Sequence, residues 1–198
     1  MAETTFGDLH LLTAPGRVMT PRPASELLVA VAAERLGGRA ARVADVGTGS
    51  GAIAIGLARL APNAEIWAGD VSAEAVELAR ANARRLGLGE RVHAVQSDLL
   101  ERLPSELDLI VANLPYLPGA DRLRYPDLAG EPAEAVFSGG DGLGLCRRLL
   151  SSAEERLTAD GAVLLQLHRR VLVAERDELA ALRASLHQHV LAELPAAA

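Results

Sequence analysis

The chain has 198 residues, of which 49% are hydrophobic and 23% charged, and this composition predicts one globular domain and excludes a disordered chain. The formal net charge is −6 and all 20 basic residues are arginine, so overall charge does not favour binding to nucleic acid or to an anionic membrane. Cys146 is the single cysteine, which excludes an internal disulfide, and no apolar run is long enough to span a membrane. We therefore expect a cytoplasmic protein with no membrane partner.

The N-terminal residues show no hydrophobic period before the first helix. They end in Thr20-Pro21-Arg22-Pro23, where two prolines keep the backbone extended. We expect residues 1–22 to form an arm that either lies across a ligand site or leads into the first helix, and residues 23–198 to form a single domain. That first helix is predicted over residues 25–36, because its pattern is helical and Gly37-Gly38 follow it.

A glycine-rich turn separates a short apolar strand from the next helix. The strand is predicted over Val43–Val46 and the helix over Ala52–Leu60, with Gly47, Gly49 and Gly51 between them. Glycines permit positive φ and let a ligand approach the backbone closely, and the free N–H groups at the start of the helix would face that ligand. This turn therefore predicts a site for a nucleotide-like ligand.

Three more strands are predicted, over Ala64–Asp70, Val92–Gln96 and Leu107–Ala112, and a helix capped by Ser72 covers Ala73–Leu86. Polar side chains stand at or near the carboxyl ends of the four strands. In an open parallel sheet with right-handed crossovers, these ends form one crevice where the strand order reverses. We therefore expect four side chains to meet around one ligand: Asp45, Asp70, Asp98 and Asn113.

The last third of the chain begins with a long irregular segment. Residues 117–142 are rich in proline and glycine, and a loop of this length is more often functional than idle, which makes it a candidate substrate lid. Beyond it, we predict a helix over Leu143–Leu157, a strand over Gly161–His168, a helix over Ala174–Leu186 and a last short strand over His189–Leu194.

The glycine turn alone does not choose the ligand. Gly47-x-Gly49-x-x-Ala52, with Asp70 after the next strand, also fits the relaxed dinucleotide fingerprint. Two features favour S-adenosyl-L-methionine (AdoMet) over NAD. Asp45 lies just before the glycines, where a carboxylate would repel a pyrophosphate but pair with the ammonium group of a methionine moiety. The sequence Asn113-Leu114-Pro115-Tyr116 has no role in hydride transfer.

Asn113-Leu114-Pro115-Tyr116 resembles the Asn-Pro-Pro-Tyr signature of amino-group methyltransferases. The chain as a whole is similar to the HemK-like protein-(glutamine-N5) methyltransferases, which modify peptide-chain release factors. The resemblance covers about residues 15–168. Several blocks carry it in order: Pro21-Arg22-Pro23 with Glu26, residues 45–54, Asp70 with Ser72 and Asn82, Ser97-Asp98, residues 113–116, and Glu131-Pro132 with residues 139–143.

The resemblance implies a Rossmann-like class I methyltransferase fold, an α/β fold in which helices flank a mostly parallel, doubly wound sheet. It implies AdoMet as cofactor and, as methyl acceptor, a glutamine side-chain amide of a protein, namely a release factor. The catalytic residues would be Asn113, Leu114, Pro115 and Tyr116. Asp70 would accept hydrogen bonds from the ribose and Asp98 or Leu99 would meet the adenine. The full expected cofactor set is Asp45, Gly47, Thr48, Gly49, Ser50, Gly51, Asp70, Val71, Asp98, Leu99 and Asn113.

The chemistry of this motif follows from the weakness of an amide as a nucleophile, since its nitrogen lone pair is delocalised into the carbonyl. If the Asn113 side-chain oxygen and the backbone carbonyl of residue 114 each accept one N–H, the NH₂ group is held with its lone pair toward the methyl group. Two fixed dipoles then stabilise the positive charge that develops on nitrogen. Tyr116 would pack against the planar amide, and no metal or strong base is needed.

The chain departs from the family in two ways. Leu114 stands where a proline is usual, but the backbone carbonyl is kept and Pro115 still biases residue 114 away from the α region, so we expect weaker preorganisation and retained chemistry. We also expect a short form without the helical N-terminal domain of bacterial members, so that a partner chain or a homodimer is an option.

Other functions stay open at this point. An RNA or DNA amino-methyltransferase would share the geometry of the motif, although the acidic composition disfavours nucleic acid. A paralogue could bind AdoMet or a partner without turnover, and a nicotinamide oxidoreductase would use the same glycine turn. No metal site is expected, because His187 and His189 have no third ligand nearby in the sequence.

Overall fold

The computed structural model of this chain describes residues 1–168 and 170–191. Its centre is a six-stranded sheet in which the strand order is β10-β9-β6-β3-β4-β5. Five strands run parallel and β10 runs antiparallel to its neighbour β9. The strands are β3 (Ala41–Val46), β4 (Ala64–Asp70), β5 (Val92–Gln96), β6 (Leu107–Ala112), β9 (Leu157–Leu167) and β10 (Arg170–Glu175).

The chain winds outward from β3 in both directions, which confirms the doubly wound sheet. Val43 of β3 lies opposite Ile66 of β4 on one side and opposite Leu109 of β6 on the other. From β3 the chain moves to β4 and β5, and then crosses back to β6 and β9. The strand order therefore reverses between β3 and β6, and a ligand crevice is expected at the carboxyl ends of these two strands.

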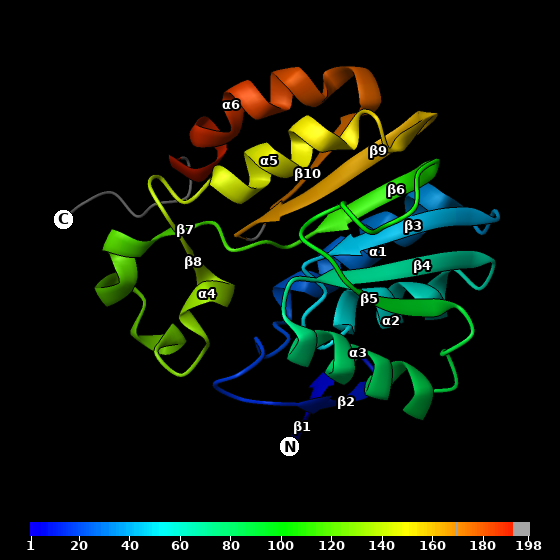
Figure 1. Cartoon of the computed structure of the whole chain (residues 1–198), viewed down its shortest axis with the longest axis horizontal. Helices are drawn as coiled ribbons and strands as arrows, with labels where there is room; N and C mark the ends of the chain where they lie inside the picture. Colours follow the sequence, from blue (N-terminus) through cyan, green and yellow to red (C-terminus); the bar gives the residue numbers. More distant parts are fainter. Residues whose placement is uncertain (169, 192–198) are drawn as a thin grey trace.

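Helices cover both faces of the sheet (Figure 1). Side chains alternate along β3, so that Val43 packs into the core on one face and Ala44 into the core on the other. One face is covered by α1 (Ala24–Leu36), α2 (Ala52–Leu60) and α3 (Ala73–Arg85), and the other by α5 (Gly144–Ala153) and α6 (Leu179–Leu191). No described helix is both long and apolar enough to cross a membrane.

The first residues form a hairpin and not the period-free arm that we expected. Its strands are β1 (Ala2–Phe6) and β2 (Leu9–Thr13), and the buried side chains of Phe6, Leu9 and Leu11 join the core beneath α1 and α2. Asn82 of α3 fixes the hairpin, because its side chain accepts from Leu12 N at 2.8 Å and donates to Leu12 O at 3.0 Å. The strands are too short, and β1 too polar, for their alternation to stand out in the sequence.

The irregular segment predicted over residues 117–142 contains no long element. It folds into a small lobe beyond the carboxyl end of β6, at the left of Figure 1. Two-residue strands hold it together, with Leu117 opposite Phe137. Its elements are β7 (Leu117–Pro118), the 3₁₀ helices η1 (Gly119–Arg124) and η2 (Pro126–Leu128), α4 (Ala133–Val136) and β8 (Phe137–Ser138).

The C-terminal elements differ from the predictions in their bounds and, at several places, in type, and β10 was not predicted. Helix α5 ends at Ala153, and residues 157–160, predicted as helix and connection, begin β9. Residues 174 and 175 end β10, and the next three residues form the 3₁₀ helix η3 (Arg176–Glu178). Glu175 and Glu178 form a capping box at η3, and α6 begins directly after it. The strand predicted from His189 was wrong up to Leu191, where the chain is still helical, and its remainder lies outside the described residues.

Candidate active site

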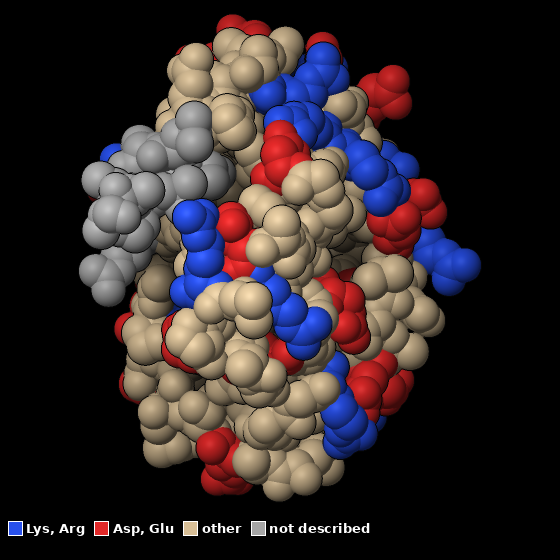
Figure 2. Space-filling view, turned by 90° about the vertical axis from the view of Figure 1, so that its left-hand side faces the viewer, with Lys and Arg blue, Asp and Glu red and all other residues tan. Residues whose placement is uncertain are grey.

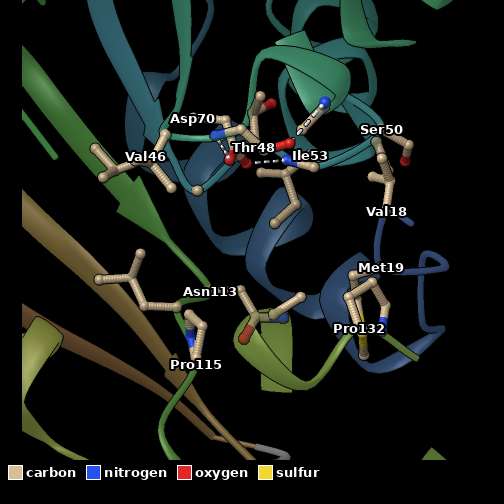
Figure 3. Close-up of a pocket in the computed structure, with 18 of the residues that line it drawn as sticks. Val18, Met19, Val46, Thr48, Ser50, Ile53, Asp70, Asn113, Pro115 and Pro132 are labelled. Carbon is tan, nitrogen blue, oxygen red and sulfur yellow. Dashed lines mark hydrogen bonds between the residues drawn. The ribbon is translucent and has the colours of Figure 1, made fainter. Parts of the chain in front are cut away.

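A cavity opens at the carboxyl edge of the sheet, at the point where the strand order reverses (Figure 3). The glycine turn after β3 and the ends of β4, β5 and β6 form one wall, and the segment before α1 and the lobe form the other. The main lining residues are 46–50, 52–53, 70–72, 97–99 and 113–115 on the first wall, and 17–22, 25, 132, 134 and 135 on the second.

The glycine turn takes the shape that the sequence predicts. Gly47, Gly49 and Gly51 all have positive φ, at 76°, 56° and 83°. A Cβ on Gly51 would come within 3.1 Å of the backbone of Ala79, and a Cβ on Gly47 would come within 2.9 Å of the Leu114 side chain. Both positions therefore need glycine for conformation and for space. The turn is also pinned to the sheet, because Gly47 N donates to Gly69 O at 2.8 Å.

Asp45 lies behind this turn and is fully buried. Its Oδ2 accepts from Thr48 Oγ1 at 2.6 Å and from Ala54 N at 3.1 Å, which ties the turn to the first residues of α2. Burial raises the pKa of the Asp45 carboxyl to about 7, and the nearby Asp70 adds to this effect. Among the described residues Asp45 is not part of the cavity lining. The structure thus gives it a role in holding the turn, where we had expected direct contact with a ligand.

Asp70 lies at the end of β4 and does line the cavity. Its Oδ2 accepts from Gly49 N and its Oδ1 accepts from Ser72 N, both at 2.9 Å (Figure 3). Burial raises the pKa of this carboxyl, although the two backbone hydrogen bonds oppose the shift. Since each carboxylate oxygen has a second lone pair, Asp70 can still accept hydrogen bonds from hydroxyl groups in the cavity.

The adjoining part of the cavity combines apolar and polar side chains. Val71 is 69% exposed although it is a large apolar residue, and its side chain lines the cavity beside Asp70. Leu99 has a φ of 48°, and Ser97 Oγ supports this uncommon conformation by donating to Leu99 O at 3.0 Å. Asp98 also lines the cavity and accepts from Arg148 Nη2 at 2.9 Å. This arrangement offers an apolar face and a polar rim to a planar ring system.

Asn113 lies at the opposite side of the cavity from Asp70, at the end of β6 (Figure 3). Its side-chain Nδ2 donates to Ser25 Oγ of α1 at 3.1 Å. Within residues 1–168 and 170–191, no group donates to Asn113 Oδ1, which leaves this oxygen as an acceptor at the cavity. Leu114 and Pro115 line the same region, and Leu114 packs against the glycine turn.

The structure corrects the expectation for Tyr116, which does not belong to the described lining of the cavity. Its hydroxyl accepts a hydrogen bond from His168 N at 2.9 Å, and its ring meets the His168 ring edge to face with centroids 5.0 Å apart. Tyr116 thereby joins the start of the lobe to the end of β9. Its hydroxyl and ring therefore hold the segment that follows Asn113.

Comparison with known proteins assigns the chain to a family. The model of the methyltransferase small domain matches residues 20–125, which is more than half of the chain. The chain belongs to the methyltransferase small domain family. Members of methyltransferase families of this class use AdoMet as methyl donor. The six-stranded mixed sheet flanked by helices is therefore a class I methyltransferase fold, as the motifs predict.

Curated relatives of this methyltransferase domain are similar over most of its length. The release factor glutamine methyltransferase of Deinococcus radiodurans is 44% identical over 170 residues, which cover 85% of this chain and 60% of that protein. The protein of the same name from Bordetella pertussis is 45% identical over 153 residues, which cover 75% of this chain and 56% of that protein. This chain therefore spans less than two thirds of the length of either relative.

A solved structure shows the same fold. The ribosomal protein L11 methylase of Lactobacillus delbrueckii subsp. bulgaricus superimposes with a TM-score of 0.55 at 25% identity, over 75% of this chain and 62% of that one. Together with the family assignment, it places the domain among the class I methyltransferases.

Sequence reasoning missed most of the second wall of the methyltransferase cavity. Val18, Met19 and Ser25 line it from the segment around the first helix, and Pro132 lines it from the lobe. The two prolines around Arg22 were the signal available for the first group, since an extended segment was expected either to cross a ligand site or to lead into a helix. It does both, because Thr20, Pro21 and Arg22 all line the cavity.

The remaining candidates are structural. Cys146 is fully buried, and burial raises the pKa of its thiol to about 12, so it stays a neutral core residue. Within the described ranges, no cluster of three or more His, Cys, Asp or Glu side chains is arranged to hold a metal ion.

Proposed function

We propose that this chain transfers the methyl group of AdoMet to the side-chain amide of a glutamine in a protein, and that this protein is a peptide-chain release factor. The observation that carries the proposal is Asn113, whose Nδ2 is engaged by Ser25 while its Oδ1 remains an acceptor at the cavity. Relatives that are 34–45% identical are named release factor glutamine methyltransferases, which supports the choice of acceptor. A cytoplasmic location follows from this substrate.

The residues of the crevice fit AdoMet. Asp70 presents a carboxylate that suits ribose hydroxyls, and Val71 with Leu99 offers an apolar place for a purine. The start of α2, behind a turn of three positive-φ glycines, suits the carboxylate of an amino acid. When bound, AdoMet supplies an electrophilic methyl group on a sulfonium. A dinucleotide is less well matched, because the family to which the chain belongs uses AdoMet.

The chain's own residues would hold the acceptor amide. An amide NH₂ has two donors, and we assign the acceptors to Asn113 Oδ1 and the backbone carbonyl of Leu114. Two acceptors at the fixed end of β6 would hold the NH₂ group in one orientation and stabilise positive charge on its nitrogen. The Leu114 side chain packs against Gly47, in the space that a Cβ at residue 47 would need.

A nucleic acid acceptor is the second candidate, because an exocyclic amino group presents the same two donors. The face that carries the lobe shows arginine and acidic side chains intermixed, with no broad basic field among the residues coloured in Figure 2. Such a surface, on a chain with a net charge of −6, gives little attraction to a phosphate backbone. The protein acceptor is therefore preferred.

The test is methyl transfer from labelled AdoMet to a purified bacterial release factor, with the labelled residue located by mass spectrometry. We expect label on a glutamine. Asn113→Ala should lower kcat about 100- to 1,000-fold, a loss typical of removing one fixed dipole from a catalytic site, while AdoMet affinity stays near that of the wild type. Label on RNA or DNA, or no transfer by the wild type, would contradict the proposal.

A further inference from the structure

We propose that Ser25 is a positioning residue that fixes the side-chain amide of Asn113 so that Oδ1, and not the NH₂ group, faces the cavity. This inference rests on the proposed function, in which that oxygen accepts a hydrogen bond from the substrate amide. It assigns a task to a residue of α1, 88 positions away from Asn113 in the chain.

The serine is held in place by its own backbone. Ser25 is the second residue of α1, and its N–H donates to Arg22 O at 3.0 Å. The residue is only 5% exposed and α1 is anchored in the core by Leu28 and Val29, so the hydroxyl has little freedom to move. Its Oγ accepts from Asn113 Nδ2 at 3.1 Å. A fixed acceptor therefore engages the NH₂ end of the amide, from a residue that lines the same cavity.

The orientation matters because the two ends of a terminal amide have the same shape and opposite hydrogen-bonding character. With Oδ1 outward, Asn113 can accept from a substrate NH₂ group. With its own NH₂ group outward, two donors would face each other and the substrate would be repelled. One rotation about the last side-chain bond thus separates a productive site from an unproductive one.

A hydroxyl can donate as well as accept. The role of Ser25 therefore depends on which end of the Asn113 amide its hydroxyl engages. In the arrangement observed, Ser25 satisfies Nδ2 and the cavity side is left to Oδ1. Without the hydroxyl, Nδ2 loses the acceptor that it has among the described residues, and an orphaned N–H is less tolerated than an orphaned carbonyl. The NH₂ group of Asn113 would then turn toward the cavity, where it finds water but blocks the substrate.

The first experiment measures methylation of a release factor by Ser25→Ala, Ser25→Thr and the control Ser152→Ala, which removes a helix hydroxyl of α5 outside this cavity. Ser25→Ala should lower kcat about tenfold, the effect of one hydrogen bond, with AdoMet affinity unchanged. Ser25→Thr keeps the hydroxyl and should restore most of the rate, and Ser152→Ala should not change it. A wild-type kcat for Ser25→Ala, or no rescue by Ser25→Thr, would overturn the proposal.

The second experiment separates positioning from a general structural role. A carboxylate has an acceptor oxygen at both ends, so in an Asn113→Asp background the orientation no longer matters. Adding Ser25→Ala to that variant should change kcat less than about twofold. The same tenfold loss in both backgrounds would show that Ser25 only supports the fold, and would overturn the proposal.

The third measurement does not depend on activity, and so distinguishes failure of this inference from failure of the proposed function. In the ¹⁵N-labelled protein, the Asn113 side-chain NH₂ should exchange slowly with water, and Ser25→Ala should abolish that protection. Equal exchange in the two proteins would contradict the hydrogen bond even if the wild type proves to methylate another substrate.

Discussion

The two walls of the cavity are built in different ways. The wall that carries the glycine turn belongs to the core: Asp45 is fully buried, Ser50 is 3% exposed, and the turn is bonded to the end of β4. The opposite wall is partly made by the lobe, residues 117–142, whose helices η1 and η2 contain no buried residue. Leu123 of the lobe is 95% exposed. One wall is therefore fixed by the sheet, whereas part of the other is a surface segment.

Contacts at Glu131 and at Gly142 help to attach the lobe to the rest of the domain. Glu131 accepts from Thr20 N at 3.0 Å and pairs with Arg22 at 3.6 Å, which joins the lobe to the segment before α1. At the other end, Gly142 packs directly on the backbone of Tyr116. We infer that the sheet side of the site recognises what all members of the class share, the cofactor, whereas the lobe side can vary with the acceptor.

The largest expected effect comes from Gly142→Ala, which disrupts the packing of the lobe on the backbone of Tyr116. Gly142 has a φ of 85°, and a Cβ there would lie 2.1 Å from Tyr116 O, so the backbone would have to move. We expect a loss of about 4 kcal/mol in the free energy of unfolding or a failure to fold. Gly140→Ala is the matched control, because Gly140 has a φ of 60° with open space around it and should lose only about 1 kcal/mol. Equal losses in urea unfolding would contradict the close packing.

A smaller effect is expected at Asp45, on the buried wall. Burial raises the pKa of this carboxyl from 3.8 to about 7. Between about pH 4 and pH 7, Asp45 is therefore protonated in the folded protein and ionised in the unfolded chain. The free energy of unfolding therefore falls as pH rises through this window, and levels above it. Asp45→Asn keeps a carbonyl oxygen for Thr48 and Ala54 but does not titrate.

The measurement at Asp45 is urea unfolding of the wild type and Asp45→Asn at pH 5 and pH 8. From pH 5 to pH 8, the wild type should lose about 2 kcal/mol of unfolding free energy relative to Asp45→Asn. A difference that does not depend on pH would show that Asp45 is ionised in the folded protein throughout this range, and that burial does not raise its pKa.

The smallest effect is expected from Glu131→Gln, which weakens the contact between lobe and arm without adding bulk. Gln keeps an acceptor for Thr20 N but loses the charge opposite Arg22. We expect about 1 kcal/mol less stability and a KM for the release factor raised about threefold, with AdoMet affinity unchanged. Glu155→Gln, at an exposed position of the surface, is the control. A matching loss of AdoMet affinity would show that the two walls are not independent.

The five parallel strands were predictable because they are short apolar runs between clear breaks, whereas the antiparallel edge strand β10 was not predicted. The positive φ of Gly47, Gly49 and Gly51 follows from the glycines themselves. The hairpin at the N-terminus was not predictable in this way, since its stability comes from Asn82 and from core residues distant in sequence. The start of the last helix was misplaced because β10 continues to Glu175 and η3, with its capping box of two glutamates, precedes α6.

The site was predictable as a set of strand ends and less so residue by residue. Asp70, Asp98 and Asn113 line one cavity, as expected from their places after parallel strands. Asp45 and Tyr116 do not, because their partners, Ala54 and His168, turn them into structural contacts. Such partners lie on other elements, and a motif does not show them.

Calorimetric titration shows whether the crevice binds AdoMet and whether Asp70 holds it there. AdoMet and NAD should be titrated in parallel into the wild type, Asp70→Asn and Asn113→Ala. We predict that AdoMet binds the wild type and Asn113→Ala alike, that Asp70→Asn weakens it about tenfold or more, and that NAD does not bind. Binding of NAD in place of AdoMet, or an AdoMet affinity that is the same with Asp70→Asn, would contradict the account.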